Sequence, residues 1–151
     1  MARCLFCEIA NGRIPSHQVW EDKDFMAFLD IFPNTEGMTV VIPKKHFPSY
    51  MFDLDDQEMG ELVKAGKKVA KKIEQGLLVK RVALVMEGMG VNHVHLKLYP
   101  LWGLEKKYTE NWSKEVVYYK EYLGYISTQL GPEKSEDELK RIAKKIRNAK
   151  N

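Results

Sequence analysis

The chain has 151 residues, with 24 Lys and Arg against 21 Asp and Glu, and a formal net charge of +3. This length suits one globular domain, the charge is too small to indicate a nucleic-acid-binding protein, and the 44% hydrophobic content excludes intrinsic disorder. Two cysteines cannot build a disulfide framework, no apolar run could span a membrane, and no secretory signal is visible. We therefore expect a cytoplasmic protein.

The first part of the chain has the composition of short β-strands. Residues 18–20 and 25–30 are rich in apolar and aromatic side chains and are separated by a polar tip, which predicts a hairpin. A β-branched segment over 38–42 that ends at Pro43 predicts a third strand.

The hydrophobic period becomes helical between Asp55 and Gln75, where apolar residues follow one stripe and five lysines lie elsewhere. Asp53 or Asp55 is suited to capping the start of this helix, and Gly76 to ending it. We interpret the lysines as a solvated face rather than as a nucleic-acid site.

Two more strands are predicted over 82–86 and 91–99, followed by a third candidate strand over 116–122. A capping box at residue 135 begins an amphipathic pattern that predicts a C-terminal helix over 135–146. Antiparallel strands with one central helix indicate an α+β fold, in which a single sheet of about five strands carries the helix on one face.

The chain is accordingly divided into two parts. Residues 1–105 form the domain that carries the candidate site, and residues 106–151 form a C-terminal extension that we expect to pack on the same domain. Trp102 lies just before the extension and Trp112 lies within it. Both are expected to take part in core or interface packing.

The predicted strand over 91–99 carries the most functional information. Alternate side chains of a strand share a face, so His93, His95 and Lys97 lie together. The same pattern would also occur on an edge strand whose polar face is simply solvated. Half of the chain's four histidines lie here, beside a glycine turn where backbone can approach a phosphate. A neutral imidazole can attack an α-phosphorus, and a nearby cation both offsets phosphate charge and favours the neutral ring. We interpret His95 as a candidate nucleophile and Lys97 as its cationic partner.

Cys4 and Cys7 have the C-x-x-C spacing that lets two thiolates reach one metal ion. From the spacing alone, a redox pair or two buried thiols are favoured as much as a metal site. A structural zinc ion needs four ligands, and His46 and His93 would complete the set. Such a site would also tie the N-terminus to the strand that carries His95.

Three stretches, over 4–15, 27–46 and 93–95, resemble the histidine triad (HIT) nucleotide-binding proteins in their motifs, order and spacing. The resemblance covers roughly residues 4–100. It implies an α+β fold that dimerises by pairing of two sheets. It also implies a nucleoside phosphate ligand and transfer of a nucleotidyl group to a histidine.

The resemblance also implies roles for single residues. His95 matches the family's nucleophile, and Asp30 matches the acid that binds the ribose hydroxyls. The apolar base pocket is matched by Leu5, Phe6, Ile9, Phe28 and Ile31. The ligands of the zinc-bearing branch are matched by Cys4, Cys7, His46 and His93, so zinc is the expected structural cofactor.

Several positions depart from the family pattern. Lys97 replaces the third histidine of the motif, and Met38 and Met86 replace a histidine and an asparagine that many members have. The glycine loop is shorter than usual, and Gly90, which we assign to phosphate binding, stands in place of a hydroxyl residue. Each change removes a contact to the phosphate or to the leaving group.

Three functions remain in order of preference. The first is a nucleotide hydrolase or nucleotidyltransferase that uses His95. The second is a non-catalytic, nucleotide-binding, zinc-stabilised dimeric module, which the missing phosphate contacts favour. The third is processing of nucleic-acid ends, for which a net charge of +3 argues little. No role at a membrane is expected, and His17, outside every motif, is expected to be a solvent-exposed side chain.

Overall fold

The computed structural model describes residues 4–127 and residues 133, 135 and 137. The chain divides into a unit that ends at Thr109 and a second unit that begins at Glu110. The elements named below, from α1 to β5, belong to the first unit. That the C-terminal extension packs on the domain stays a prediction.

The described part of the second unit changes one prediction. Residues 110–127 contain neither helix nor strand, so the strand predicted over 116–122 is wrong. Its aromatic residues, such as Tyr118 and Tyr119, are exposed, and among the described residues no strand pairs with this segment. β-propensity alone does not make a strand that lacks a hydrogen-bonding neighbour. The helix predicted over 135–146 lies outside the described residues, apart from 135 and 137.

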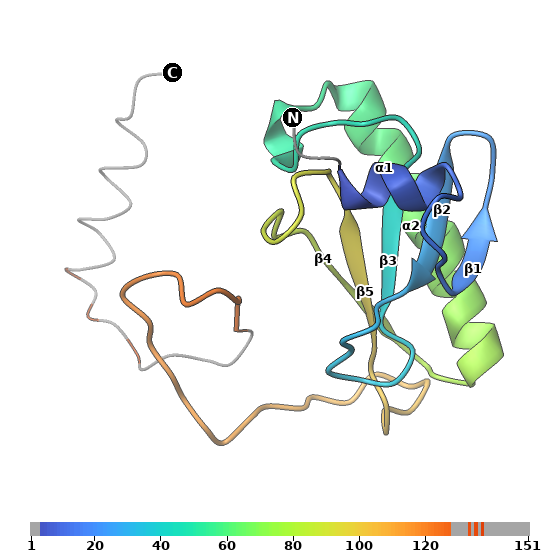
Figure 1. Cartoon of the computed structure of the whole chain (residues 1–151). Coiled ribbons are helices and arrows are strands. Elements are labelled where there is room, and N and C mark those ends of the chain that lie inside the picture. Colours follow the sequence, from blue (N-terminus) through green and yellow to red (C-terminus); the bar gives the residue numbers. More distant parts are fainter. Residues whose placement is uncertain (1–3, 128–132, 134, 136, 138–151) are drawn as a thin grey trace. The chain divides into compact units, whose positions relative to one another are not determined.

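The first unit is built on a five-stranded antiparallel sheet with the strand order β1-β2-β3-β5-β4 (Figure 1). The strands are β1 (Gln18–Glu21), β2 (Phe25–Leu29), β3 (Thr39–Pro43), β4 (Val82–Val85) and β5 (Leu96–Pro100). With the helix described next, this sheet confirms the predicted α+β class.

The predicted hairpin is formed by β1 and β2. At its polar tip the Asp22 carboxylate accepts hydrogen bonds from the backbone N–H groups of Asp24 and Phe25, at 3.0 and 2.9 Å. An aspartate that binds its own backbone in this way stabilises a tight turn, which explains why the polar segment separates two strands.

The central helix α2 (Asp56–Leu77) begins where the sequence predicts, because the Asp55 side chain accepts the N–H of Glu58 at 2.8 Å. It runs past Gly76 and ends at Leu78, which has a φ of 58°. The one added helical residue, Leu77, packs on the core, where its side chain lies over Gly37. Among the described residues, no helix is long and apolar enough to cross a membrane.

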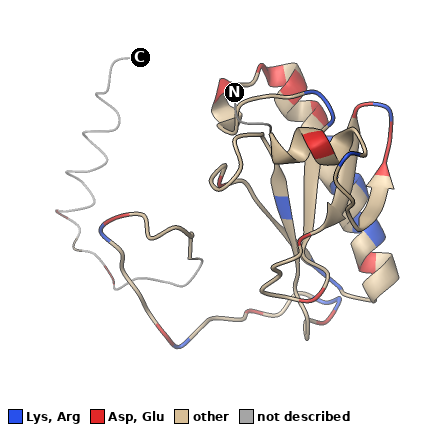
Figure 2. Ribbon diagram, in the orientation of Figure 1, with Lys and Arg blue, Asp and Glu red and all other residues tan. Residues whose placement is uncertain are grey.

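The lysines of α2 are interspersed with acidic residues (Figure 2). Lys64 pairs with Glu61 at 2.7 Å, and Lys71 with Glu74 at 2.6 Å, each one turn apart on the exposed side. Such i, i+3 pairs are typical of a solvated helix face and leave little net positive charge for a polyanion.

Figure 1 shows α2 behind the sheet and a short helix, α1 (Leu5–Ala10), in front of it. The α2 face holds the larger core, which includes Val41, Leu62 and Leu96. The opposite face holds a smaller cluster made by Phe6, Met26, Phe28, Val40 and Ile42. We call this second side the α1 face.

The strand predicted over 91–99 begins only at Leu96. If the β3–β5 register continued, Pro43 would lie opposite Val94, but proline has no N–H to donate. The N–H of Val94 instead donates to the carbonyl of Phe47 at 3.1 Å. His93 and His95 therefore lie in an irregular segment that leads into β5, and only Lys97 lies in the strand.

Candidate metal centre and histidine site

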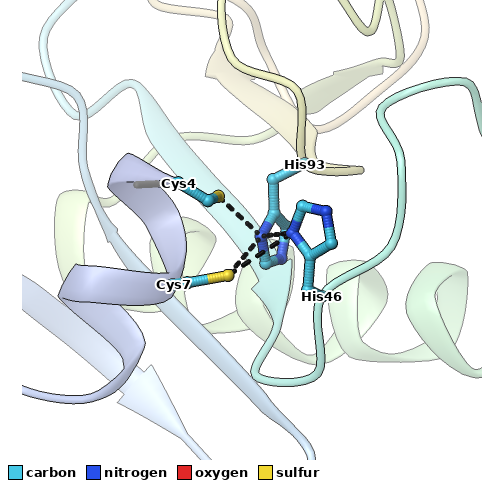
Figure 3. Close-up of side chains that lie close together, drawn as sticks. All are labelled: Cys4, Cys7, His46 and His93. Carbon is cyan, nitrogen blue, oxygen red and sulfur yellow. Dashed lines mark hydrogen bonds between the residues drawn. The ribbon is translucent and has the colours of Figure 1, made fainter. Parts of the chain in front are cut away.

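Four side chains from three separate segments converge beside α1 (Figure 3). Cys4 and Cys7 come from the first turn of α1 and the residue before it, His46 follows β3, and His93 precedes β5. One ligand atom of each lies within 4.8 Å of the others. The structure thus brings together the four residues that the sequence suggested as metal ligands.

The spacing of these atoms fits a tetrahedral metal ion. His93 Nδ1 lies 3.4 Å from Cys4 Sγ, 3.5 Å from Cys7 Sγ and 3.4 Å from His46 Nδ1. Zinc bonds of about 2.3 Å to sulfur and 2.0–2.1 Å to nitrogen place tetrahedral ligand atoms about 3.3–3.8 Å apart. Cys7 Sγ also lies 3.4 Å from His46 Nδ1, so four of the six separations suit a tetrahedral ion, and all four atoms lie within 4.8 Å of one another.

Backbone contacts hold His93 in the form that a metal requires. Its ring is fully buried, and its Nε2–H donates to the carbonyl oxygen of Pro43 at 2.9 Å. The proton is therefore on Nε2, and Nδ1 presents a lone pair to the two thiols. Burial also lowers the pKa of His93, which favours the neutral ring.

The Cys7 thiol keeps its proton unless a cation displaces it. Burial, together with a smaller contribution from its hydrogen bond with Cys4, raises the pKa of the Cys7 thiol to about 11. A metal ion binds the thiolate, so binding at this site releases protons and depends on pH.

His95 is oriented by the backbone of His93. Its Nδ1–H donates to the His93 carbonyl oxygen at 2.7 Å, which leaves Nε2 as the ring nitrogen with a lone pair. Burial lowers the pKa of His95, and Lys97 lowers it as well, whereas Glu87 and Asp30 act in the opposite direction. The result is a buried, neutral imidazole in one defined tautomer.

Phe6 links the metal cluster to His95. Its ring packs edge-on against His93 and His95, with centroids 5.9 and 5.2 Å apart, and against Phe28 at 5.6 Å. Helix α1 therefore supplies two candidate metal ligands and the ring that supports the candidate nucleophile.

The residues expected to surround a base occupy different environments. Phe6 and Phe28 are buried, and Ile9 packs against them on the α1 face. Leu5 and Ile31 are 44% and 70% exposed, and neither belongs to this cluster.

Two other expected contacts lie at turns. Asp30 follows β2, and its carboxylate accepts the N–H of Phe32 at 2.8 Å, which holds the carboxylate in place. Gly90 has a φ of +91°, and no atom lies within 4 Å of where its Cβ would be. Its backbone is therefore open to a ligand.

Lys97 does not stand alone. Its Nζ lies 3.3 Å from the Glu87 carboxylate, and both side chains are mostly buried. The sequence pattern does not indicate Glu87. The only signal for it is its position directly before the Gly88 turn, and the pairing depends on the β4–β5 register.

Comparison with known proteins agrees with this geometry. The HIT domain family matches residues 11–101. "Protein hit" of Bacillus subtilis is 33% identical over 133 residues, which are 84% of this chain and 91% of that protein. A HIT family hydrolase from Legionella pneumophila is 32% identical, with a TM-score of 0.55 over 70% of this chain and 97% of that one.

A Zn-bound histidine triad family protein from Mycobacterium smegmatis is 29% identical, with a TM-score of 0.59. The match covers 72% of this chain and 82% of the other. The family match spans more than half of the chain and includes His46, His93, His95 and Lys97. The chain therefore belongs to the HIT domain family.

Proposed function

We propose that this protein is a nucleotide hydrolase or nucleotidyltransferase that acts at the α-phosphate of a nucleoside phosphate or phosphoramidate. One observation carries the proposal: the Nδ1–H of His95 is bound to the His93 carbonyl, so Nε2 is the nitrogen available for attack. Membership of the HIT family supports the same chemistry, and a similar protein of known structure is named a hydrolase.

The reaction proceeds in two displacements. In the first, the lone pair of His95 Nε2 forms a bond to the α-phosphorus, and the bond from phosphorus to the leaving group breaks. The leaving atom keeps the electron pair and takes a proton from solvent. In the second, water or an acceptor hydroxyl attacks the phosphorus and loses its proton to solvent, and the electron pair of the broken P–N bond returns to Nε2.

Lys97 offsets the negative charge of the reacting phosphate. Its register partner Val40 belongs to the cluster on the α1 face, where Phe6 contacts His95, so Lys97 and His95 lie on the same side of the sheet. A positive charge at this position also favours the neutral, nucleophilic form of His95.

The remaining contacts to substrate follow from the family resemblance. The Asp30 carboxylate binds the ribose hydroxyls, and the open Gly90 backbone approaches the phosphate. The base lies on an apolar surface made by Leu5, Phe6, Ile9, Phe28 and Ile31.

Zinc is the metal that the cluster suits best, because two thiolates and two imidazoles form a common structural zinc set. The ligands would be Cys4, Cys7, His46 and His93. Four protein ligands leave no open position, so the bound ion would cross-link α1 to the segments before β5 and after β3. In this proposal the zinc site stabilises the fold. The protein is also proposed to be a cytoplasmic homodimer.

A second candidate function is a non-catalytic nucleotide-binding module with the same zinc site and dimer. The ion pair of Lys97 with Glu87 favours it, because the third histidine of the motif is replaced by a cation that is already partly neutralised. Met86 also favours the non-catalytic module, because many members of the family have an asparagine at this position.

Incubation with α-³²P-labelled adenosine and guanosine nucleotides separates the two candidates. Wild type and the matched control His17→Ala, which changes an exposed histidine, should release labelled nucleoside monophosphate and carry label after rapid quenching. His95→Ala should do neither. If wild type shows no turnover and no label but binds nucleoside monophosphates in calorimetry, the second candidate is correct.

A further inference from the structure

The ion pair between Lys97 and Glu87 lies on the side of the sheet where His95 is held. Lys97 is the register partner of Val85, and Glu87 follows Val85 by two residues, so an extended chain returns its side chain to the same face. Nζ and Oε2 are 3.3 Å apart, and the two side chains are only 22% and 10% exposed. The pair is thus shielded from bulk solvent more than an ordinary surface ion pair.

The turn after Glu87 holds this carboxylate in place. Gly88 has a φ of +72°, and a Cβ there would lie 2.7 Å from the backbone oxygen of Ser49. Ser49 is in turn anchored, because its N–H donates to the Asn92 side chain at 3.0 Å. The backbone at Gly88 therefore packs closely against the segment at Ser49, which limits the positions that Glu87 can adopt beside Lys97.

Lys97, Glu87 and Asp30 together contribute one net negative charge near His95. Lys97 supplies one positive charge, Glu87 lies against it, and Asp30 adds a second carboxylate that also acts on His95. A substrate with several negative charges would meet a cation that is already paired and two carboxylates that repel it. A phosphate with a single negative charge would meet less repulsion.

We propose that Glu87 is a specificity-determining residue: by pairing with Lys97, it makes this site prefer nucleoside phosphates of low total negative charge, such as phosphoramidates, over nucleoside polyphosphates. The inference rests on the proposed function of the same site and names its substrate class.

Two substrates with the same nucleoside test it. Adenosine 5′-phosphoramidate loses ammonia when its P–N bond breaks, ADP loses phosphate when its α–β P–O bond breaks, and both yield AMP. Wild type should have the higher kcat/KM for the phosphoramidate. In Glu87→Gln the ratio should shift toward ADP by roughly three- to tenfold at low ionic strength, and less in high salt. The guanosine pair is measured in parallel.

Two more variants keep the test decisive. Glu61→Gln removes the same charge from a 2.7 Å ion pair with Lys64 on α2, and it should leave the ratio unchanged. Lys97→Gln leaves Glu87 without its cation and should shift the ratio away from ADP. This second variant carries the test if Glu87→Gln does not fold, as judged by its melting temperature.

The outcomes separate the inference from the proposed function. If wild type turns over both substrates and neither Glu87→Gln nor Lys97→Gln changes the ratio, the inference alone is overturned. A wild-type preference for ADP overturns it in the same way. If AMP and ADP bind without turnover, the ratio of their dissociation constants replaces the kinetic ratio, with the same expected shifts. Neither turnover nor binding in wild type overturns both.

Discussion

At the scale of residues, one carbonyl links the metal centre to the candidate nucleophile. His93 points its ring at the thiols and its backbone oxygen at His95 Nδ1–H. A change in the position of His93 therefore alters both the metal site and the tautomer of His95. This double role gives a physical reason for a histidine two residues before the candidate nucleophile.

His93→Ala should therefore lower stability as well as activity. The substitution removes a fully buried ring, its hydrogen bond to Pro43 and a metal ligand, so we expect a loss of about 2–4 kcal/mol in the free energy of unfolding. Urea titration measures this loss. His17→Ala, at an exposed site, is the control, and equal midpoints for the two variants would refute the assignment of His93.

At the scale of elements, α1 is too short to be stable alone. It has six residues, no side-chain N-cap and only Phe6 buried, whereas isolated helices shorter than about 12 residues are marginal in water. Its position beside the sheet is stabilised by Phe6, and by Cys4 and Ile9, which pack on the cluster of the α1 face. A bound metal would supply the stronger constraint.

Removal of the metal should consequently loosen α1 before the rest of the domain. After dialysis against a chelator under reducing conditions, amide hydrogen exchange should rise in a peptide that covers Leu5–Ala10 and stay unchanged in one from the middle of α2. Addition of zinc should restore the protection. Equal exchange with and without metal would show that the cluster does not hold α1.

Much of this architecture could be predicted from the sequence. The two apolar segments over 18–30, with a polar tip between them, predict β1 and β2, and the helical stripe after Asp55 predicts α2. The start of β5 could not be predicted, since it depends on Pro43 in a neighbouring strand. Helix α1 was also missed, because six residues carry too little periodicity.

The candidate site could also be predicted only in part from the sequence. The metal ligands follow from the chemistry of zinc, which needs two more ligands beside Cys4 and Cys7. The structure places His93 Nδ1 3.4 Å from Cys4 Sγ although 88 residues lie between them in the sequence. Glu87 could not be found in this way, because its pairing with Lys97 appears only once β4 and β5 are in register.

At the scale of the whole molecule, the full chain purified without chelator should contain about one zinc ion per chain. This follows from the convergence of four ligand atoms within 4.8 Å. Elemental analysis under reducing conditions measures the content, and Cys7→Ser, which removes a ligand, should lose most of it. A metal-free protein with a disulfide between Cys4 and Cys7 would contradict the assignment.

The central claim is that His95 carries the nucleotidyl group during turnover. The most direct test quenches wild type during reaction with a nucleoside phosphoramidate, digests it, and locates the adduct by tandem mass spectrometry in the peptide that contains His93 and His95. We predict one nucleoside monophosphate on His95 and none on His93, whose nitrogens face Pro43 and the thiols. Turnover without an adduct on His95, or equal turnover by His95→Ala, would contradict the mechanism.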